Sequence, residues 1–212
     1  MLRELYKYAE EHSTPQPPLL NDIERRTNIH LINGRMCSGL LQGRFLKMLV
    51  NMIRPKRVLE LGTFSGFASL CIAEALEPDA TLDTIEIDDE LEDFIRQNFS
   101  ISPHGHKINL HIGAAEMIAS GWEKDTFDLV FLDADKRRYC EDFDIVFPLV
   151  KPGGYIIADN TLWDGHVIEP QKHNDPQTRG IIEFNEMIRS RSDIEAVMLP
   201  LRDGLTLIRK NT

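Results

Sequence analysis

Acidic and amide side chains follow two apolar runs of the sequence at the point where each run ends. Asp133 comes directly after run 127–132, and Asp159 and Asn160 come directly after run 155–158. The carboxyl ends of neighbouring parallel strands meet at one edge of a sheet, so these three oxygen donors would lie together. Such a set leaves a Mg²⁺-like ion open positions for water or substrate oxygens. We therefore predict an open metal site, and zinc is disfavoured because no cysteine or histidine joins the group.

A lysine three positions after Asp133 can reach the same site. A nearby cation and partial burial both disfavour an ammonium group, so we expect the pKa of Lys136 to fall toward that of a general base. In the competing interpretation, Asp133 or Asp135 caps the next helix, Asp159 and Asn160 form an ordinary turn, and Lys136 is solvated. Two such motifs at neighbouring strand ends favour the metal site.

The first apolar run leads into a glycine loop that reads Glu60-Leu61-Gly62-Thr63-Phe64-Ser65-Gly66. Glycines at 62 and 66 let the backbone turn tightly and approach a ligand closely. The spacing is G-x-x-x-G, whereas a dinucleotide site normally reads G-x-G-x-x-G and a P-loop ends in Lys-Ser/Thr. By itself, the loop also fits a tight strand-to-helix turn that binds nothing.

The next apolar run ends in an acidic residue, Glu86. A carboxylate there can accept both hydroxyls of a ribose, an arrangement shared by nicotinamide and S-adenosylmethionine sites. A third loop, 113–116, has small residues against which an adenine ring can lie, although a plain helix start explains it equally well. Together these loops indicate a nucleoside-binding site without choosing the cofactor.

The elements that must position these residues alternate along the chain. Short apolar runs at 58–61, 81–85, 108–112, 129–132 and 155–158 are each followed by a segment long enough for a crossover helix. This alternation predicts a parallel sheet with helices on both faces.

The last two runs, 194–200 and 205–209, are separated by a turn too short for a parallel crossover, so they must form an antiparallel hairpin. The predicted fold is α/β: a three-layer αβα sandwich with a mostly parallel seven-stranded sheet closed by an antiparallel C-terminal hairpin. This outline is typical of a Rossmann-like class I methyltransferase.

The first part of the chain reads as helical cover rather than as a separate domain. A proline cluster at 15–18 interrupts two amphipathic segments, and a further helical pattern from Leu40 to Ile53 stops at Pro55. We predict a single domain spanning 1–212, with N-terminal helices in 1–55 and the Rossmann-like core in 56–212.

The composition excludes several classes of protein. The chain has 212 residues, with 24 Lys and Arg against 34 Asp and Glu and a formal net charge of −10. This acidity disfavours nucleic acid as a partner, and no apolar run is long enough to span a membrane. Its three cysteines fit neither a disulfide framework nor a zinc site, which favours a reducing cytoplasm.

These residues together resemble a known family, the metal-dependent class I O-methyltransferases that include the caffeoyl-CoA and catechol O-methyltransferases. The resemblance covers most of the chain, from about Met36 to Lys210. Its matching segments are 36–39 with Gln42-Gly43, 58–66, 86–88, 113–114, 132–136 with Tyr139, 159–163, and 199–205.

The resemblance implies a cofactor, a metal and a reaction. The family's ligands are S-adenosylmethionine and a divalent cation, here Mg²⁺, with Mn²⁺ or Ca²⁺ as alternatives. It implies metal ligation by Asp133, Asp159 and Asn160, a base at Lys136, and a homodimer. It implies contacts of S-adenosylmethionine with Ser38, Glu60, Gly62, Thr63, Gly66, Glu86, Ala115 and Asp133.

The expected reaction is an in-line methyl transfer to a small phenolic substrate with two vicinal hydroxyls, a catechol or caffeoyl-like acceptor. Trp163 follows the metal pair and is expected to contact this substrate, although it would serve equally well to anchor its loop to the core. Val197 stands where catechol enzymes carry a glutamate, and Arg191-Ser192-Asp193 replaces the family's Asp-x-Arg. A catechol-style clamp and recognition of a CoA ester are therefore not assumed.

Features of the sequence oppose three other functions. A nicotinamide oxidoreductase is opposed by the missing third glycine and the carboxylate cluster. A nucleic-acid methyltransferase would be favoured by an Asn/Asp-Pro-Pro-Tyr/Phe motif or a basic stripe, and the sequence has neither. A catalytically silent module that only binds S-adenosylmethionine would not need Asp133, Lys136, Asp159 and Asn160 together.

Overall fold

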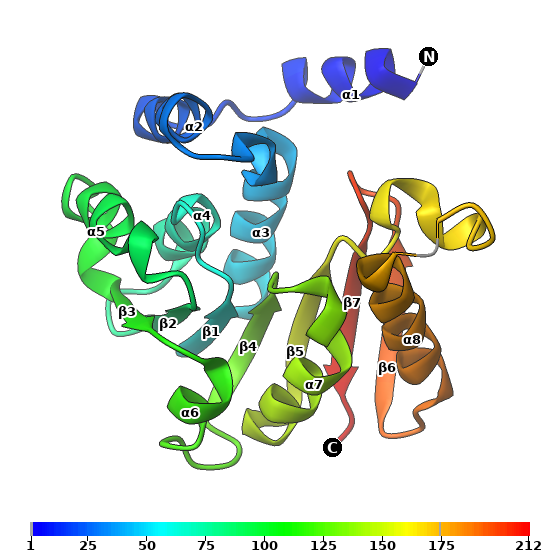
Figure 1. The fold of residues 1–212 in the computed structure, drawn as a ribbon. Coiled ribbons are helices and arrows are strands. Elements are labelled where there is room, and N and C mark those ends of the chain that lie inside the picture. The colour runs from blue at the N-terminus through cyan, green and yellow to red at the C-terminus, as the bar shows by residue number, and fades with distance from the viewer. Residues whose placement is uncertain (1, 174) are drawn as a thin grey trace.

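The structure is a computed structural model that describes residues 2–173 and 175–212. Within these residues, seven strands pair into one sheet. The strand order is β3-β2-β1-β4-β5-β7-β6 (Figure 1). The strands are β1 (Arg57–Leu61), β2 (Thr81–Glu86), β3 (Ile108–Ile112), β4 (Phe127–Leu132), β5 (Val150–Asp159), β6 (Ile194–Leu199) and β7 (Leu205–Lys210).

The sheet direction changes only at the C-terminal end of the chain. Strands β1 to β5 pair in parallel, whereas β7 pairs antiparallel with both β5 and β6. The predicted fold class, including the C-terminal hairpin, is confirmed. The strand order reverses at β1, whose neighbours are β2 and β4, and the carboxyl edge at such a reversal is where open α/β sheets bind ligands.

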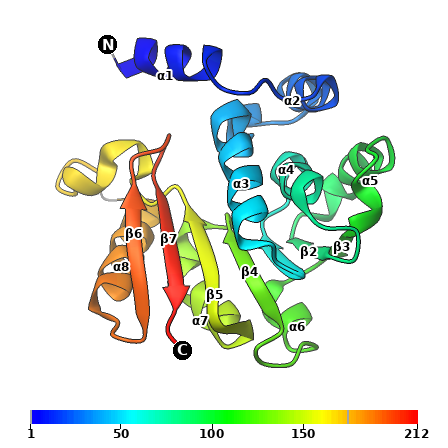
Figure 2. The same ribbon diagram turned by 180° about the vertical axis from the view of Figure 1, so that it is seen from behind.

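Helices cover both faces of the sheet. Figures 1 and 2 show α3, α4 and α5 on one face and α6, α7 and α8 on the other. The helices are α1 (Leu2–Glu11), α2 (Pro18–His30), α3 (Gly39–Ile53), α4 (Phe67–Ala75), α5 (Glu92–Ser100), α6 (Ala115–Ala119), α7 (Tyr139–Val146) and α8 (Pro176–Ser190).

Each face of the sheet has its own apolar layer. On one face, Tyr139 and Phe143 of α7 and Phe184 of α8 pack in edge contacts and are fully buried. On the other face, Leu46 and Val50 of α3 pack against the sheet. Strands that are buried on both sides read as continuous apolar runs, which is why β1 and β4 could be located in the sequence.

Helices α1 and α2 lie beyond the carboxyl edge of the sheet rather than on a face of it, as both views show. Proline at the start of α2 separates it from α1. The Tyr6 hydroxyl of α1 accepts a hydrogen bond from the Arg202 backbone N–H at 2.7 Å and donates one to the Pro200 carbonyl at 3.2 Å. The first helix is therefore joined to the tip of the C-terminal hairpin.

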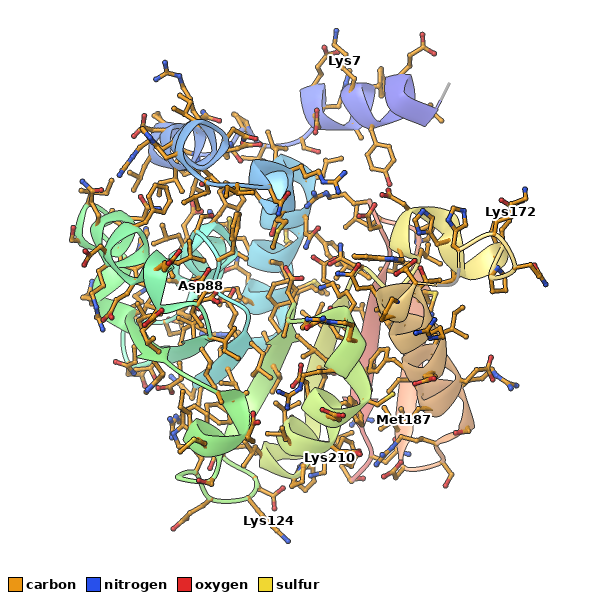
Figure 3. All side chains as sticks on the ribbon, viewed as in Figure 1. Lys7, Asp88, Lys124, Lys172, Met187 and Lys210 are labelled. Atoms are coloured by element: carbon orange, nitrogen blue, oxygen red, sulfur yellow. The ribbon has the colours of Figure 1, made fainter. Side chains whose placement is uncertain are left out.

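Charged side chains project from the outside of the sandwich, as Lys7, Lys124 and Lys172 do (Figure 3). Among the described helices, none combines the length and apolar character needed to cross a membrane.

Candidate active site

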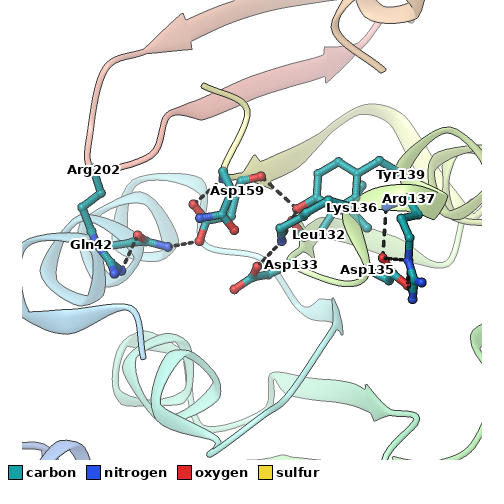
Figure 4. A network of polar contacts seen from close by, with 10 residues as sticks. Gln42, Leu132, Asp133, Asp135, Lys136, Arg137, Tyr139, Asp159 and Arg202 are labelled. Atoms are coloured by element: carbon teal, nitrogen blue, oxygen red, sulfur yellow. Dashed lines mark hydrogen bonds and ion pairs between the residues drawn. The ribbon is translucent and has the colours of Figure 1, made fainter. Parts of the chain in front are cut away.

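The ends of β4 and β5 lie side by side at the carboxyl edge of the sheet. Leu132 pairs with Ala158, so Asp133 and Asp159 follow at adjacent positions, as predicted from the sequence. The buried Tyr139 hydroxyl lies 3.2 Å from the Leu132 carbonyl oxygen and 2.8 Å from that of Asp159 (Figure 4). One side chain of α7 thus fixes the relative position of the two strand ends.

Lys136 is buried in this site rather than solvated. Its side chain is 9% exposed, and Nζ donates to Asp133 Oδ1 at 2.7 Å and to the Tyr139 hydroxyl at 2.8 Å (Figure 4). Asp135 caps the short 3₁₀ helix Lys136–Arg138 through the Arg137 N–H. The capping interpretation is therefore correct for Asp135, while Lys136 points inward beside Asp133.

The Asp159 carboxylate is almost fully buried and is held at both oxygens. Oδ1 accepts the Asn160 N–H at 2.7 Å, and Oδ2 accepts Gln42 Nε2 at 2.5 Å. Burial, followed by the neighbouring charge of Asp133, raises the pKa of Asp159 above its usual range. Asn160 adopts a left-handed conformation with φ of 55°, and its carbonyl oxygen and that of Asp203, at the tip of the hairpin, both accept the Trp163 backbone N–H, at 3.2 and 3.0 Å.

The donor chemistry of this cluster fits a hard divalent cation. Its predicted ligands are two carboxylates and one amide, all oxygen donors. Within the described residues, no three His, Cys, Asp or Glu side chains are grouped to hold a metal, so the set reaches three only through Asn160. Burial and the charge of Asp133 raise the pKa of Asp159, and a cation would offset both, because a positive charge favours the two ionised carboxylates. The ligand roles of these residues stay predictions.

The glycine loop between β1 and α4 packs directly against the carboxylate cluster. Gly62 has φ of +91°, and a Cβ added there would lie 2.1 Å from the Asp133 carbonyl oxygen. Gly66, at φ of +77°, would place a Cβ 2.4 Å from Phe99. Only glycine permits this close approach, so the predicted cofactor loop and the predicted metal site form one contiguous surface.

Glu86 turns back to the same loop from the end of β2. Its Oε2 accepts the Phe64 N–H at 2.7 Å, and its Oε1 accepts the Asp88 N–H at 3.0 Å. The carboxylate is therefore fixed at the edge of the glycine loop, where the ribose contact was predicted. The Thr63 hydroxyl is instead paired with Thr84 at 2.6 Å inside the fold.

Glu60 lies inside the fold beneath the loop and is fully buried. Its Oε2 accepts hydrogen bonds from the hydroxyls of Ser69 and Thr84, whereas Oε1 has no partner among the described groups. Burial, opposed by those two hydroxyls, raises the pKa of Glu60 to about 8.

The remaining predicted residues lie around this edge at different depths. Ser38 is buried where α3 begins, and Ala115 is the first residue of α6, the helix that follows β3. The Trp163 side chain packs partly against the core cluster of α7 and α8, and its backbone N–H donates to the Asp203 carbonyl oxygen at 3.0 Å. The packing of Trp163 matches the loop-anchoring interpretation, and its contact with a substrate stays a prediction.

Four further residues line the site, and sequence reasoning gave them no role: Gln42, Tyr139, Arg202 and Asp203. All four occur in the matching motifs, so those motifs carried a usable signal. The role of Arg202 could still not be inferred from its motif, because its contacts to the start of α3 exist only in the folded chain.

Known proteins resemble this chain along most of its length. A family model described as O-methyltransferase matches residues 10–211. A caffeoyl-CoA O-methyltransferase of Petroselinum crispum is 34% identical over 97% of this chain and 90% of its own length. Caffeoyl-CoA O-methyltransferase 2 of Zea mays is 31% identical over 98% of this chain and 83% of its own length.

Solved structures show the same likeness. An O-methyltransferase of Streptomyces achromogenes involved in tomaymycin synthesis, in complex with SAM, has a TM-score of 0.89 at 27% identity and covers 99% of this chain and 96% of its own. An O-methyltransferase of Bacillus cereus in complex with SAH has a TM-score of 0.88 at 25% identity, covering 97% and 96%.

Proposed function

This chain belongs to the class I S-adenosylmethionine-dependent O-methyltransferases of the caffeoyl-CoA type, and on that premise we propose that it methylates one hydroxyl of a small vicinal diphenol with the help of a divalent cation. Membership of this family makes it an enzyme and removes the nicotinamide oxidoreductase from consideration. The observation that carries the proposal is the grouping of Asp133, Lys136 and Asp159 at adjacent strand ends, against the glycine loop.

S-adenosylmethionine is proposed to bind along the carboxyl edge, from Ser38 across the glycine loop to Ala115. The fixed carboxylate of Glu86 would accept the ribose hydroxyls, and the left-handed glycines 62 and 66 would allow the backbone to approach the ligand. Solved relatives in complex with SAM or SAH support this choice of cofactor.

Asp133, Asp159 and Asn160 are proposed to hold the cation, with Mg²⁺ as the first choice and Mn²⁺ or Ca²⁺ as alternatives. When bound, it would supply positive charge that orients the acceptor hydroxyls and makes one of them easier to deprotonate. Lys136 Nζ, released from its proton, would then take the hydroxyl proton. The new O–CH₃ bond forms as the S–CH₃ bond breaks. The electron pair of the broken bond stays on sulfur, which leaves S-adenosylhomocysteine.

The acceptor is proposed to enter through a hollow of about 540 Å³ between the N-terminal helices and the hairpin tip. Tyr6 of α1, Glu24 of α2, Ser38, Arg202 and Asp203 are among its lining residues. The Trp163 backbone N–H contacts the carbonyl oxygens of both Asp203 and Asn160, so the hollow adjoins the proposed ligands. A hollow of this size lies in the range that holds small-molecule ligands.

We also propose that the protein is cytoplasmic and forms a homodimer. The three cysteines are free thiols, which suits a reducing cytoplasm. The resemblance to the family also supports a homodimer.

Methyl transfer tests the proposed function directly. The purified protein is incubated with methyl-labelled S-adenosylmethionine, Mg²⁺ and either a vicinal diphenol or the matched phenol with one hydroxyl. We expect a labelled methyl ether from the diphenol and little or none from the monophenol. Equal transfer to both phenols would contradict the proposed two-hydroxyl recognition, and no transfer to any diphenol would contradict the proposed acceptor class.

A further inference from the structure

Gln42 is a fully buried polar residue on a helix face that is otherwise apolar. It lies in the first turn of α3, one turn before the core residue Leu46, and its side chain points to the end of β5 (Figure 4). Burying an amide without hydrogen-bond partners destabilises the folded state, so an amide at such a position must have partners.

Those partners are an anion and a cation from distant parts of the chain. Gln42 Nε2 donates to Asp159 Oδ2 at 2.5 Å, and Gln42 Oε1 accepts from Arg202 Nη1 at 3.0 Å. A guanidinium can only donate and an ionised carboxylate can only accept. A side chain between them must do both, and only one orientation of the amide satisfies both contacts.

Arg202 is itself fixed in place. Its guanidinium also donates to the backbone carbonyls of Ser38 and Cys37, and its backbone N–H donates to the Tyr6 hydroxyl. It thereby joins the hairpin tip to the start of α3, where Ser38 is a proposed S-adenosylmethionine contact. The guanidinium cannot leave Gln42 without also breaking these bonds.

The hydrogen bonds from Arg202 to Gln42 and from Gln42 to Asp159 leave the Asp159 carboxylate one orientation. Gln42 holds Oδ2 while the Asn160 N–H holds Oδ1 at 2.7 Å, so the group cannot rotate without losing a bond. We propose that Gln42, braced by Arg202, is a positioning residue that presents the Asp159 carboxylate to the divalent cation. This inference rests on the proposed function, because it requires that Asp159 bind the cation.

The test measures cation binding as well as catalysis. Gln42→Met removes both hydrogen bonds at nearly constant volume, and Arg202→Met removes the brace from the hairpin. Gln97→Leu is the matched control, because Gln97 accepts a hydrogen bond from Arg26 at 2.6 Å on the exposed side of α5. Mg²⁺ and S-adenosylmethionine affinities are measured by titration calorimetry, and initial rates are measured across Mg²⁺ concentration.

We expect Gln42→Met to weaken Mg²⁺ binding about 10- to 100-fold, the usual effect of losing a group that orients a ligand. Its S-adenosylmethionine affinity should stay within about twofold of wild type, and saturating Mg²⁺ should restore most of kcat. Arg202→Met should weaken the binding of both Mg²⁺ and S-adenosylmethionine, because it also removes the hydrogen bond to the Ser38 carbonyl. The double variant should bind Mg²⁺ no more weakly than Gln42→Met, since the two residues act in series.

Mg²⁺ affinity in Gln42→Met equal to that of Gln97→Leu would overturn the inference. If Gln42→Met does not fold by circular dichroism, Arg202→Met decides, and wild-type Mg²⁺ affinity in that variant would overturn it equally. A wild-type protein that binds no Mg²⁺ and methylates in EDTA would contradict the proposed metal dependence itself, which is a different and separately visible result.

Discussion

Lys136 Nζ lies 2.7 Å from Oδ1 of Asp133, so the proposed base and a proposed metal ligand share one hydrogen bond. The ammonium group balances part of the carboxylate charge at the strand ends and is held from the other side by the Tyr139 hydroxyl. A bound cation would take over that balancing, so Lys136 could give up its own proton and the neutral amine could then accept the proton of the acceptor hydroxyl. The two groups are therefore expected to contribute separately, one to proton transfer and the other to cation binding.

Replacing the lysine tests the first of these contributions. Lys136→Met should lower kcat about 10²- to 10⁴-fold, the range for loss of a general base, with Mg²⁺ binding retained. Lys172→Met is the control, because Lys172 is an exposed partner of Glu169. A kcat for Lys136→Met within a few fold of that of Lys172→Met would exclude the lysine as the base.

Gly62 provides a test of the contact between the cofactor loop and β4. Gly62→Ala should lower the free energy of unfolding by about 3 kcal/mol or more, because it adds overpacking to a left-handed backbone. The added Cβ would meet the Asp133 carbonyl at 2.1 Å, whereas at Gly165, with φ of +80°, no atom lies within 4 Å. Gly165→Ala should thus cost only about 1–2 kcal/mol. Equal losses in the free energy of unfolding, measured with urea, would mean that the close approach to Asp133 adds nothing to the destabilisation.

The fold itself was largely predictable from the sequence, because buried strands read as short apolar runs between turns. The exception is the start of β5, which begins at Val150, before the predicted 155–158 run. Pro152-Gly153-Gly154 reads as a turn, yet the chain continues as strand beside a register shift against β4. Tertiary pairing overrides the local turn signal there.

The site was predictable only where its residues follow strands. Asp133, Glu86 and Asp159 end or follow apolar runs, and topology alone brings them to one edge. Gln42 lies 117 positions from Asp159 and Arg202 lies 160 positions from Gln42, so no local pattern connects them. Contacts of this kind arise when a helix and a hairpin tip pack together, which sequence spacing does not encode.

Glu60 gives a pH dependence whose sign is fixed by its raised pKa of about 8. The folded state holds this proton more tightly than the unfolded chain, where the ordinary value is 4.5. Its contribution to stability is therefore greatest below pH 4.5 and is lost as the pH rises through about 8. Glu60→Gln removes the titrating group. The melting temperature of this variant, measured by circular dichroism, should therefore rise relative to that of wild type as the pH increases from 6 to 9. A difference that stays constant with pH would show that Glu60 titrates normally.

The charge of the proposed acceptor hollow predicts a preference among diphenols. Glu10, Glu24, Asp164 and Asp203 line it against Arg35 and Arg202, and the Arg202 guanidinium is already occupied. A diphenol with a protonated amine should have kcat/KM about 3- to 10-fold above its carboxylate analogue at low salt, with a smaller ratio at high salt.

Glu24→Gln should reduce this preference for the amine, and the exposed Glu186→Gln should leave it unchanged. A strong preference for a polyanionic CoA ester would contradict this account of the hollow.

Removal and return of the cation test the central claim most directly. Wild-type protein is stripped with EDTA, desalted and assayed for methyl transfer to a vicinal diphenol before and after Mg²⁺ is added back. The proposed site predicts that activity falls at least about 10²-fold on stripping and returns with Mg²⁺, as expected where a cation stabilises developing charge. Asp133→Ala should stay inactive at the same Mg²⁺ concentration, whereas Asp79→Ala, which alters an exposed carboxylate paired with Lys56, should behave as wild type. Full activity in the stripped wild-type protein, or in Asp133→Ala, would contradict the claim.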